Sequence, residues 1–147
     1  MTLRATSFRR AASLGDTPFD IVVLDADARH LRRKLLTLEH GDEVLVDFEK
    51  AVQLAHGDRL VLDDGRVAEV IAAEEDLMEV KGRDAVHLVK LAWHIGNRHL
   101  PAQIEPDRIL VRRDAVIARM LEGLGAAVVN VTEPFHPEHG AYHSHGH

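Results

Sequence analysis

The chain has 147 residues, of which 46% are hydrophobic and 29% are charged, and its formal net charge is −6. This balance is typical of a folded protein, and the length allows one ordinary domain or two small ones. The negative charge argues against a nucleic-acid partner, because no basic excess is available for phosphates. The absence of cysteine excludes disulfides and thiolate metal sites. No apolar run is long enough to span a bilayer, and the N-terminus lacks the apolar segment of a secretory signal, so we expect a soluble cytoplasmic protein without a membrane partner.

The first part of the chain, residues 1–73, is expected to be a small all-β N-terminal domain. Asp64-Gly65 predicts a hairpin turn. His40 and His56 each precede a glycine, and they are predicted to be solvated turn residues rather than metal ligands. Short β-branched segments between polar turns predict strands at 20–24, 31–38, 43–48, 60–62 and 67–72.

The second part, residues 74–135, follows the order strand, helix, strand, strand, helix, strand. This order predicts a ferredoxin-like βαββαβ domain, so the predicted fold class is α+β. The first helix is expected to begin after an Asp84 cap and to end at Gly96-Asn97, since both of these residues tolerate left-handed backbone. Its predicted buried face contains Ala85, Leu88, Val89, Ala92 and Ile95.

The second helix is expected to begin after an Asp114 cap and to end at Gly125. Its predicted apolar stripe contains Val116, Ile117, Met120, Leu121 and Leu124.

The last segment, residues 136–147, is predicted to be a flexible His-rich tail that binds metal. Imidazole is mostly a neutral base at pH 7, and without cysteine the ligands are nitrogen and oxygen, which suits nickel, copper or zinc. In an extended chain, alternation places the rings of His143, His145 and His147 on one side. His136 and His139 are further candidates whose roles the sequence leaves open.

Two more histidines flank the predicted end of the first helix. His94 and His99 are five residues apart, which on a helix of ~3.6 residues per turn separates them by about 140°. They are therefore not expected to chelate one ion. We expect His94 to be packed or hydrogen-bonded. His99 lies in a connection where it is a candidate ligand, and a two-fold dimer would supply a second copy of it.

Three other interpretations remain in view. A metal-dependent hydrolase is disfavoured, because no His-Glu-x-x-His motif is present and the densest ligand segment is expected to be mobile. A nickel or zinc storage protein is the main alternative, in which the tail binds metal and His99 is dispensable.

The run Arg32, Arg33 and Lys34 could dock an acidic partner, although a solvated strand is the favoured interpretation.

Several motifs together resemble the urease accessory protein UreE, a nickel metallochaperone family. The most specific is Gly96-Asn97-Arg98-His99-Leu100-Pro101, within residues 91–104. The resemblance continues through 32–38, 57–65, 113–125, 133–135 and 140–142.

This resemblance implies a homodimer joined through the second domain, with His99 of both chains binding one Ni2+ ion. It implies that tail histidines among His143, His145 and His147 complete or supplement the site, and which of them does so stays open. Zn2+ or Cu2+ can bind the same ligands. The first domain would contact partners. Such a protein is not an enzyme: it passes nickel, through an accessory GTPase in the urease apoprotein maturation complex, for nickel insertion into urease.

Overall fold

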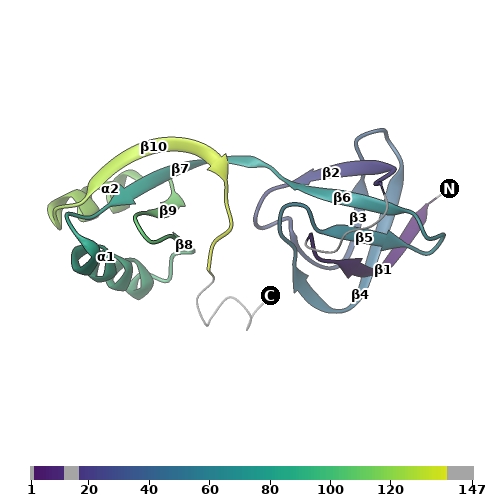
Figure 1. Cartoon of the computed structure of the whole chain (residues 1–147), viewed down its shortest axis with the longest axis horizontal. Helices are drawn as coiled ribbons and strands as arrows, with labels where there is room; N and C mark the ends of the chain where they lie inside the picture. Colours follow the sequence, from purple (N-terminus) through teal and green to yellow (C-terminus); the bar gives the residue numbers. More distant parts are fainter. Residues whose placement is uncertain (1, 12–16, 139–147) are drawn as a thin grey trace. The chain divides into compact units, whose positions relative to one another are not determined.

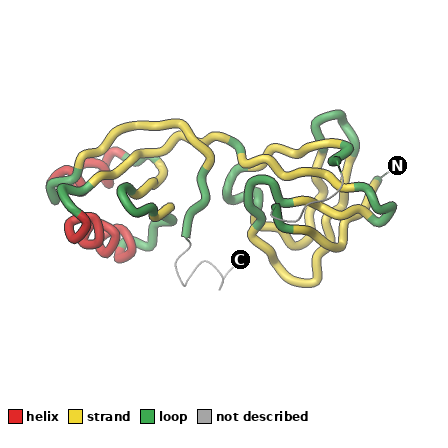
Figure 2. Tube along the Cα trace, viewed as in Figure 1, coloured by secondary structure: helices red, strands yellow, loops and turns green. Residues whose placement is uncertain are grey.

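The computed structural model of the chain describes residues 2–11 and 17–138. The chain divides into two compact units, Met1–Ala73 and Glu74–His147, called here the N-terminal and C-terminal units (Figure 1). Both helices belong to the C-terminal unit, and the N-terminal unit consists of strands and loops (Figure 2). The fold is therefore mostly β with two helices, in agreement with the α+β prediction. Within the described residues, no helix has the length and apolar character needed to cross a membrane.

The N-terminal unit is a six-stranded sheet with the order β2-β6-β5-β1-β4-β3. The pairs β1/β4 and β2/β6 are parallel, and the other neighbours are antiparallel. All five predicted strands are present, but β1 was not predicted, because Ala5 is its one fully buried side chain and arginines interrupt its apolar pattern. The strands are β1 (Leu3–Arg9), β2 (Asp20–Leu24), β3 (His30–Thr37), β4 (Glu43–Gln53), β5 (Arg59–Leu62) and β6 (Val67–Ala72).

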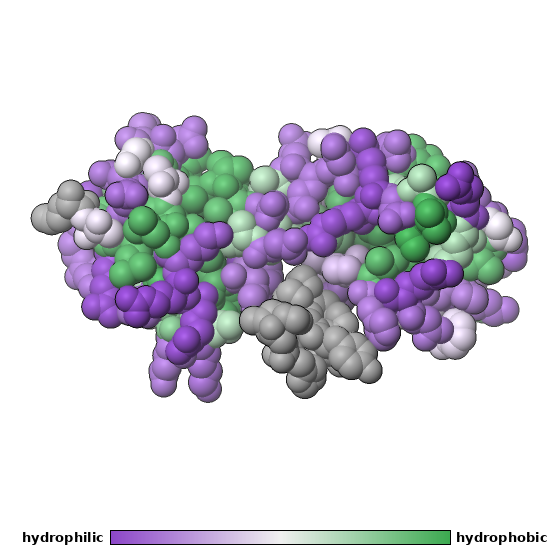
Figure 3. Space-filling view, turned by 180° about the vertical axis from the view of Figure 1, so that it is seen from behind, coloured by the Kyte–Doolittle hydropathy of each residue, from purple (hydrophilic) through white to green (hydrophobic). Residues whose placement is uncertain are grey.

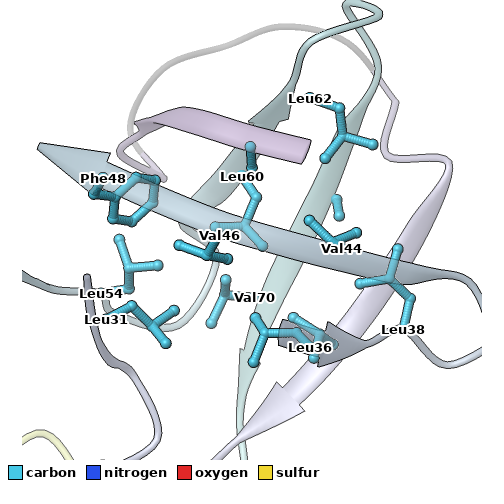
Figure 4. Close-up of a cluster of buried hydrophobic side chains, with 13 residues drawn as sticks. Leu31, Leu36, Leu38, Val44, Val46, Phe48, Leu54, Leu60, Leu62 and Val70 are labelled. Carbon is cyan, nitrogen blue, oxygen red and sulfur yellow. The ribbon is translucent and has the colours of Figure 1, made fainter. Parts of the chain in front are cut away.

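Alternating apolar side chains of these strands make the core of the N-terminal unit. Val44, Val46 and Phe48 project from one face of β4 into the cluster shown in Figure 4, as the two-residue period of a strand requires. The amide of Glu39, which follows β3, donates to the carbonyl of Ile21 in β2 at 2.9 Å. The sheet therefore curls until its two edges meet at this point.

His40 and His56 lie in turns and are exposed, as predicted, and each also has a hydrogen-bonding contact within the N-terminal unit. The His40 ring (Nδ1) lies 2.8 Å from Asp20 Oδ1, and the His40 amide donates to Asp20 Oδ2. Burial alone would raise the pKa of the Asp20 carboxyl, but hydrogen bonds from the Ile21 amide and from His40 hold that pKa below its usual range. His56 Nδ1 accepts a hydrogen bond from the Ala72 amide.

The C-terminal unit has a four-stranded sheet with the order β10-β7-β9-β8 and two helices. Its neighbouring strands are all antiparallel. The carboxylates of Asp84 and Asp114 accept amide hydrogen bonds at the starts of α1 and α2, which confirms both predicted caps. The elements are β7 (Glu74–Lys81), α1 (Ala85–Asn97), β8 (Gln103–Ile104), β9 (Ile109–Arg112), α2 (Ala115–Gly123) and β10 (Ala127–Pro134).

Helix α1 buries a face that overlaps the predicted one: Leu88 and Ile95 are buried and Ala92 is partly buried, as predicted, whereas Ala85 is exposed. Leu88, Leu91 and Ile95 pack with α2 and the sheet in the core of the unit. Val89, predicted to be buried, is 68% exposed. On α2, Ile117 and Leu121 are buried as predicted, whereas Val116 is exposed. The sequence pattern misplaced the edge of the buried face, because α1 also carries exposed apolar side chains and periodicity alone does not say where the buried face ends.

A network of charges centred on Arg108, the residue before β9, ties this end of β9 to β7 and β10. Arg108 makes two hydrogen bonds of 2.8 Å to the carboxylate of Glu133 in β10. It also contacts Glu105 at 3.0 Å and Glu79 in β7 at 3.1 Å. The Arg108 side chain is 19% exposed, and its hydrogen bonds hold the pKa of the Glu133 carboxyl below its usual value. The network therefore stabilises the ionised form of Glu133.

We expect the substitution Arg108→Met to lower the free energy of unfolding of the C-terminal unit by about 2–3 kcal/mol, because it leaves three carboxylates without their shared cation. Lys81→Met is the matched control, since Lys81 is more exposed and lies 3.8 Å from the same Glu79. Its expected loss is below about 1 kcal/mol. Urea unfolding followed by the fluorescence of Trp93 measures both, and equal losses would show that the network adds nothing beyond a surface pair.

The Arg108→Met variant also tests how the free energy of unfolding depends on pH. A carboxyl whose pKa is lowered on folding stabilises the fold above its ordinary pKa, and this contribution is lost as the pH falls through the folded value. The native protein should therefore lose more stability between pH 6 and pH 3 than Arg108→Met does. Parallel stability curves for the two proteins would contradict the effect on Glu133.

Candidate metal centre

His99, the predicted ligand, lies in the turn that ends α1. The helix ends at Asn97, so its predicted end at Gly96-Asn97 is confirmed, but neither of these residues takes the left-handed backbone on which the prediction rested. The left-handed residue is His99 itself, with φ 58°, and its amide donates to the Gly96 carbonyl at 3.0 Å. Left-handed backbone costs about 1–2 kcal/mol for a residue with a Cβ. His99, which is exposed, therefore adopts a backbone conformation that glycine would adopt at a lower free energy.

The other described histidines of the C-terminal unit have distinct surroundings. His87, which the sequence did not single out, is 6% exposed: its Nδ1 accepts from the Arg83 amide, and its Nε2–H donates to the Leu124 carbonyl. With both nitrogens engaged, His87 joins the start of α1 to the end of α2. His94 is partly buried, and its ring meets the Trp93 ring edge-on at 5.1 Å between centroids. This agrees with the expected packed role of His94.

The chain after β10 returns to the segment that follows His99. Phe135 is fully buried, with the Arg112 guanidinium 5.2 Å from its ring centroid. Ala102 and Glu138 then form an antiparallel bridge, in which each amide donates to the other residue's carbonyl at 3.2 and 2.7 Å. The last described residue is thus held beside the turn that carries His99.

Gln103 reinforces this attachment. Its Oε1 accepts the His136 amide at 2.8 Å, and its Nε2 donates to Glu105 Oε2 at 2.7 Å. We call the contacts of Ala102 and Gln103 with residues 136–138 the tail clasp. Sequence reasoning missed it, although a large apolar residue at Phe135 was a signal that the chain there is anchored. The predicted tail ligands His143, His145 and His147, and His139, lie outside the described residues.

The described part of the chain gathers no group of three histidine, aspartate or glutamate side chains suited to one metal ion. His99 and His94 are therefore not completed locally into a closed site. A closed structural site for a metal such as zinc takes four protein ligands. The local geometry offers one exposed imidazole on a well-supported turn, and further ligands would have to come from the tail or from another chain.

Sequence comparisons place both units in one class of protein. Residues 5–73 match the family described as "UreE urease accessory protein, N-terminal domain". Residues 75–147 match "UreE urease accessory protein, C-terminal domain". Each unit thus corresponds to one domain of a two-domain urease accessory protein.

Individual relatives give the same result over nearly the whole chain. It is 56% identical over 144 residues to "Urease accessory protein UreE" of Agrobacterium fabrum, covering 98% of this chain and 89% of the relative. It is 58% identical over 146 residues to the protein of that name from Brucella anthropi, covering 97% and 86%. The corresponding protein of Rhizobium leguminosarum bv. trifolii is 56% identical over 143 residues, covering 97% and 74%. The chain belongs to the UreE family of urease accessory proteins.

We expect the substitution Gln103→Leu to loosen the tail clasp, because leucine keeps the size of the side chain but removes both hydrogen bonds. Amide exchange at His136 and Glu138 should become about tenfold faster, which corresponds to one hydrogen bond of ~1.4 kcal/mol. Exchange in α1 should not change. Hydrogen exchange followed by NMR measures this, with Gln53→Leu in the N-terminal unit as the control. Unchanged exchange at His136 would show that Gln103 does not hold the chain end.

Proposed function

We propose that this protein is a nickel metallochaperone that carries Ni2+ as cargo and delivers it for assembly of the urease active site. Membership of the UreE family supports the link to urease maturation. The observation that carries the metal proposal is the exposed His99 ring on a left-handed turn, beside the anchor of a histidine-rich tail. The function is binding and transfer in the cytoplasm, not catalysis. An accessory GTPase and the urease apoprotein are the proposed partners, and the N-terminal unit is proposed to contact them.

The proposed metal site forms between two copies of the chain. One imidazole binds a divalent ion weakly, so His99 of each protomer would supply one ligand on a two-fold axis. His143, His145 and His147 are the proposed tail ligands. The clasp supports this, because it holds Glu138 against Ala102, which is three residues in sequence from His99. An extended chain gains about 3.3–3.6 Å per residue, so His143 could reach up to about 18 Å from Glu138.

The proposed dimer interface is the outer face of α1. Val86, Val89 and Trp93 follow one another at helical spacing and are 65%, 68% and 65% exposed. An apolar stripe of this kind on a surface helix indicates an interaction site. The stripe lies on the same helix as His94, and the helix ends at the turn of His99, so a two-fold axis close to that turn would bring two His99 residues toward each other.

We also infer that the C-terminal unit has the ferredoxin-like arrangement. The order β7, α1, β8, β9, α2, β10 and the sheet order β10-β7-β9-β8 support it. The buried faces of both helices contribute to one cluster with Met78, Val80 and Val111 of the sheet. This arrangement would leave the outer face of α1 available to a second protomer.

The alternative function, nickel storage, predicts a different role for His99. A store would bind nickel through the tail alone, and His99 would be dispensable. A carrier has to release its cargo, and a few imidazoles from separate segments allow this better than a closed cage does. Intrinsic affinity favours copper over nickel at most nitrogen and oxygen sites, so Zn2+ and Cu2+ are expected to compete in vitro.

The first test is nickel binding by the intact protein and by His99→Ala and His99→Gly. We expect one tight ion per two chains in the native protein and its loss in both variants. Glycine should also raise the free energy of unfolding by about 1 kcal/mol, because it removes the left-handed strain, so lost binding cannot be attributed to misfolding. Calorimetry with mass determination on the same sample measures binding. His94→Ala is the control and should bind normally.

Binding should weaken as the pH falls below about 6.5, because protonated imidazole does not coordinate. If His99→Ala binds nickel as well as the native protein, the tail is the binding element and storage replaces delivery. Loss of urease activation in cells by His99→Ala with the tail intact would support delivery.

The dimer proposal predicts that Val89→Glu dissociates the protein. A buried unpaired carboxylate at the centre of the stripe should weaken association at least tenfold, or by ~1.4 kcal/mol. Leu35→Glu is the matched control, since Leu35 is an exposed apolar residue of β3 outside the stripe. Sedimentation equilibrium measures both. Undiminished dimerisation of Val89→Glu would exclude this face of α1 as the interface.

A further inference from the structure

We propose that the side chain of Tyr142 binds in a hollow between α1 and β8 of the same chain, and that this contact keeps the histidines after it close to His99. The hollow is called here the α1–β8 hollow, and its volume is about 140 Å³. The inference deepens the proposed function and rests on it for the role of the contact, but the contact itself is testable without metal. The lining residues that carry the argument are Ile95, Gly96, Leu100, Ala102, Ile104 and Glu138.

The hollow lies where the edge of the sheet extends beyond the helices. β8 is an edge strand, and its Ile104 pairs with Ile109 of β9. Paired residues of neighbouring strands point to the same face of a sheet. Ile109 is fully buried in the core beneath the helices, whereas Ile104 is 57% exposed. Ile104 therefore forms an apolar wall of the hollow that the described residues leave largely open to solvent.

Gly96 opens the hollow on the side of α1. A Cβ at this position would meet no described atom within 4 Å beyond its immediate chain neighbours and its own helix backbone. The backbone of Gly96 does not take a positive φ, so its conformation does not require glycine. Glycine inside a helix costs about 0.5–1 kcal/mol relative to alanine. The missing side chain thus leaves space beside the helix at a cost in helix stability.

The size and lining of the hollow suit one aromatic ring. An apolar cavity of about 150 Å³ can hold a benzene molecule, and the lining here is aliphatic apart from Glu138. A buried tyrosine ring usually keeps its hydroxyl at a polar edge, and the exposed Glu138 offers an acceptor at such an edge. Figure 3 shows hydrophobic residues at the surface of both units, so exposure alone would not identify the occupant.

The position of the chain end selects Tyr142 as the occupant. Glu138 is the last described residue, it lines the hollow, and its bridge to Ala102 is antiparallel. The chain therefore leaves Glu138 in the direction of Leu100. Tyr142 follows four residues later, a span of at most about 13–14 Å, and it is the one tyrosine of the chain.

The alternation of side chains favours the same occupant. Glu138 and Ala102 are bridge partners, so both point to the face of the sheet that the helices cover. In an extended chain, side chains two and four residues after Glu138 point to that face as well. These positions are Gly140, which has no side chain to fill the hollow and permits a turn, and Tyr142.

A ring held in this hollow would place the tail histidines near the proposed nickel ligand. Gly96 and Leu100 line the hollow and lie three residues before and one residue after His99. His143 follows Tyr142 directly, so its imidazole would start from beside the turn of His99. A shorter tether raises the effective concentration of the tail imidazoles at that turn. Tyr142 would thus act as a positioning residue for the metal site.

The contact is tested by NMR on the metal-free full chain. Because the chain has one tyrosine, growth with meta-fluorotyrosine gives a single fluorine resonance, which reports on Tyr142. We expect a smaller shift in heavy water than free fluorotyrosine shows, and nuclear Overhauser effects from the ring to methyl groups of Leu100 and Ile104. The solvent response of free fluorotyrosine, or contacts to other methyl groups only, would overturn the proposal.

Gly96→Leu fills the hollow from the helix and should return the fluorine resonance to the solvent response of free fluorotyrosine. Gly123→Leu is the matched control, because Gly123 is a glycine of α2 whose Cβ would also meet nothing within 4 Å. Both variants should fold, since leucine favours helix over glycine. Equal effects of the two would show that the ring is not in the hollow. Mixing fluorinated chains with methyl-labelled chains is a further check, and contacts seen only between chains would contradict binding within one chain.

Nickel titration tests the positioning role. Tyr142→Ala should bind Ni2+ about fivefold to tenfold more weakly than the native protein, whereas Tyr142→Phe keeps the ring and should bind like it. Gly96→Leu should match Tyr142→Ala, and the double variant should be no weaker than either, because both changes remove one contact. Unchanged binding by Tyr142→Ala, or additive losses in the double variant, would overturn this role.

These measurements can fail separately from the proposed function. If the ring does not contact the hollow while His99→Ala still abolishes tight binding, this inference is wrong and the nickel proposal stands. If the ring contacts the hollow but the native protein has no tight nickel site, the proposed function is wrong and the hollow keeps Tyr142 as its occupant.

Discussion

The orientation of α1 on its sheet determines the main features of the C-terminal unit. Leu88, Leu91 and Ile95 are buried against α2 and the strands, and this burial fixes which way the helix faces. Each fully buried aliphatic side chain contributes about 1.5–3 kcal/mol, so rotating the helix would be costly. Two consequences follow from one packing contact. Val86, Val89 and Trp93 are left outside, and the helix ends at an exposed turn whose backbone is set by His99.

Features fixed by local interactions were predictable from the sequence. The caps at Asp84 and Asp114 depend on a side chain and amides two or three residues away, and such short-range contacts leave a clear sequence signal. The position at which α1 ends was also predicted, but the residue that takes the left-handed backbone after it was not. Gly96 and Asn97 are the residue types that usually take left-handed backbone, yet His99 takes it here. The identity of a residue gives a preference, and the surrounding structure decides where the turn closes.

Features fixed by distant contacts were not predictable. The strand β1 has a weak apolar pattern, and its place between β5 and β4 depends on pairing with residues some forty to sixty positions away. The bridge of Ala102 with Glu138 has the same character. Histidine positions could be counted in the sequence, but the attachment that brings residues 136–138 to the segment after His99 could not be predicted. The sequence alone also identified the family correctly, because the motif around His99 is specific.

The hydrogen bonding of the last described segment changes abruptly between β10 and residues 136–138. β10 pairs with β7 at eight consecutive positions, whereas Glu138 is attached through its bridge to Ala102 and the His136 amide through the side chain of Gln103. Local opening costs less where fewer hydrogen bonds and apolar contacts must break. Residues 136–138 should consequently detach from the surface and rebind many times while the sheet stays folded. The buried Phe135 should keep this opening from extending into β10. Residues 136–138 would then open and close while the sheet to which they are attached stays folded.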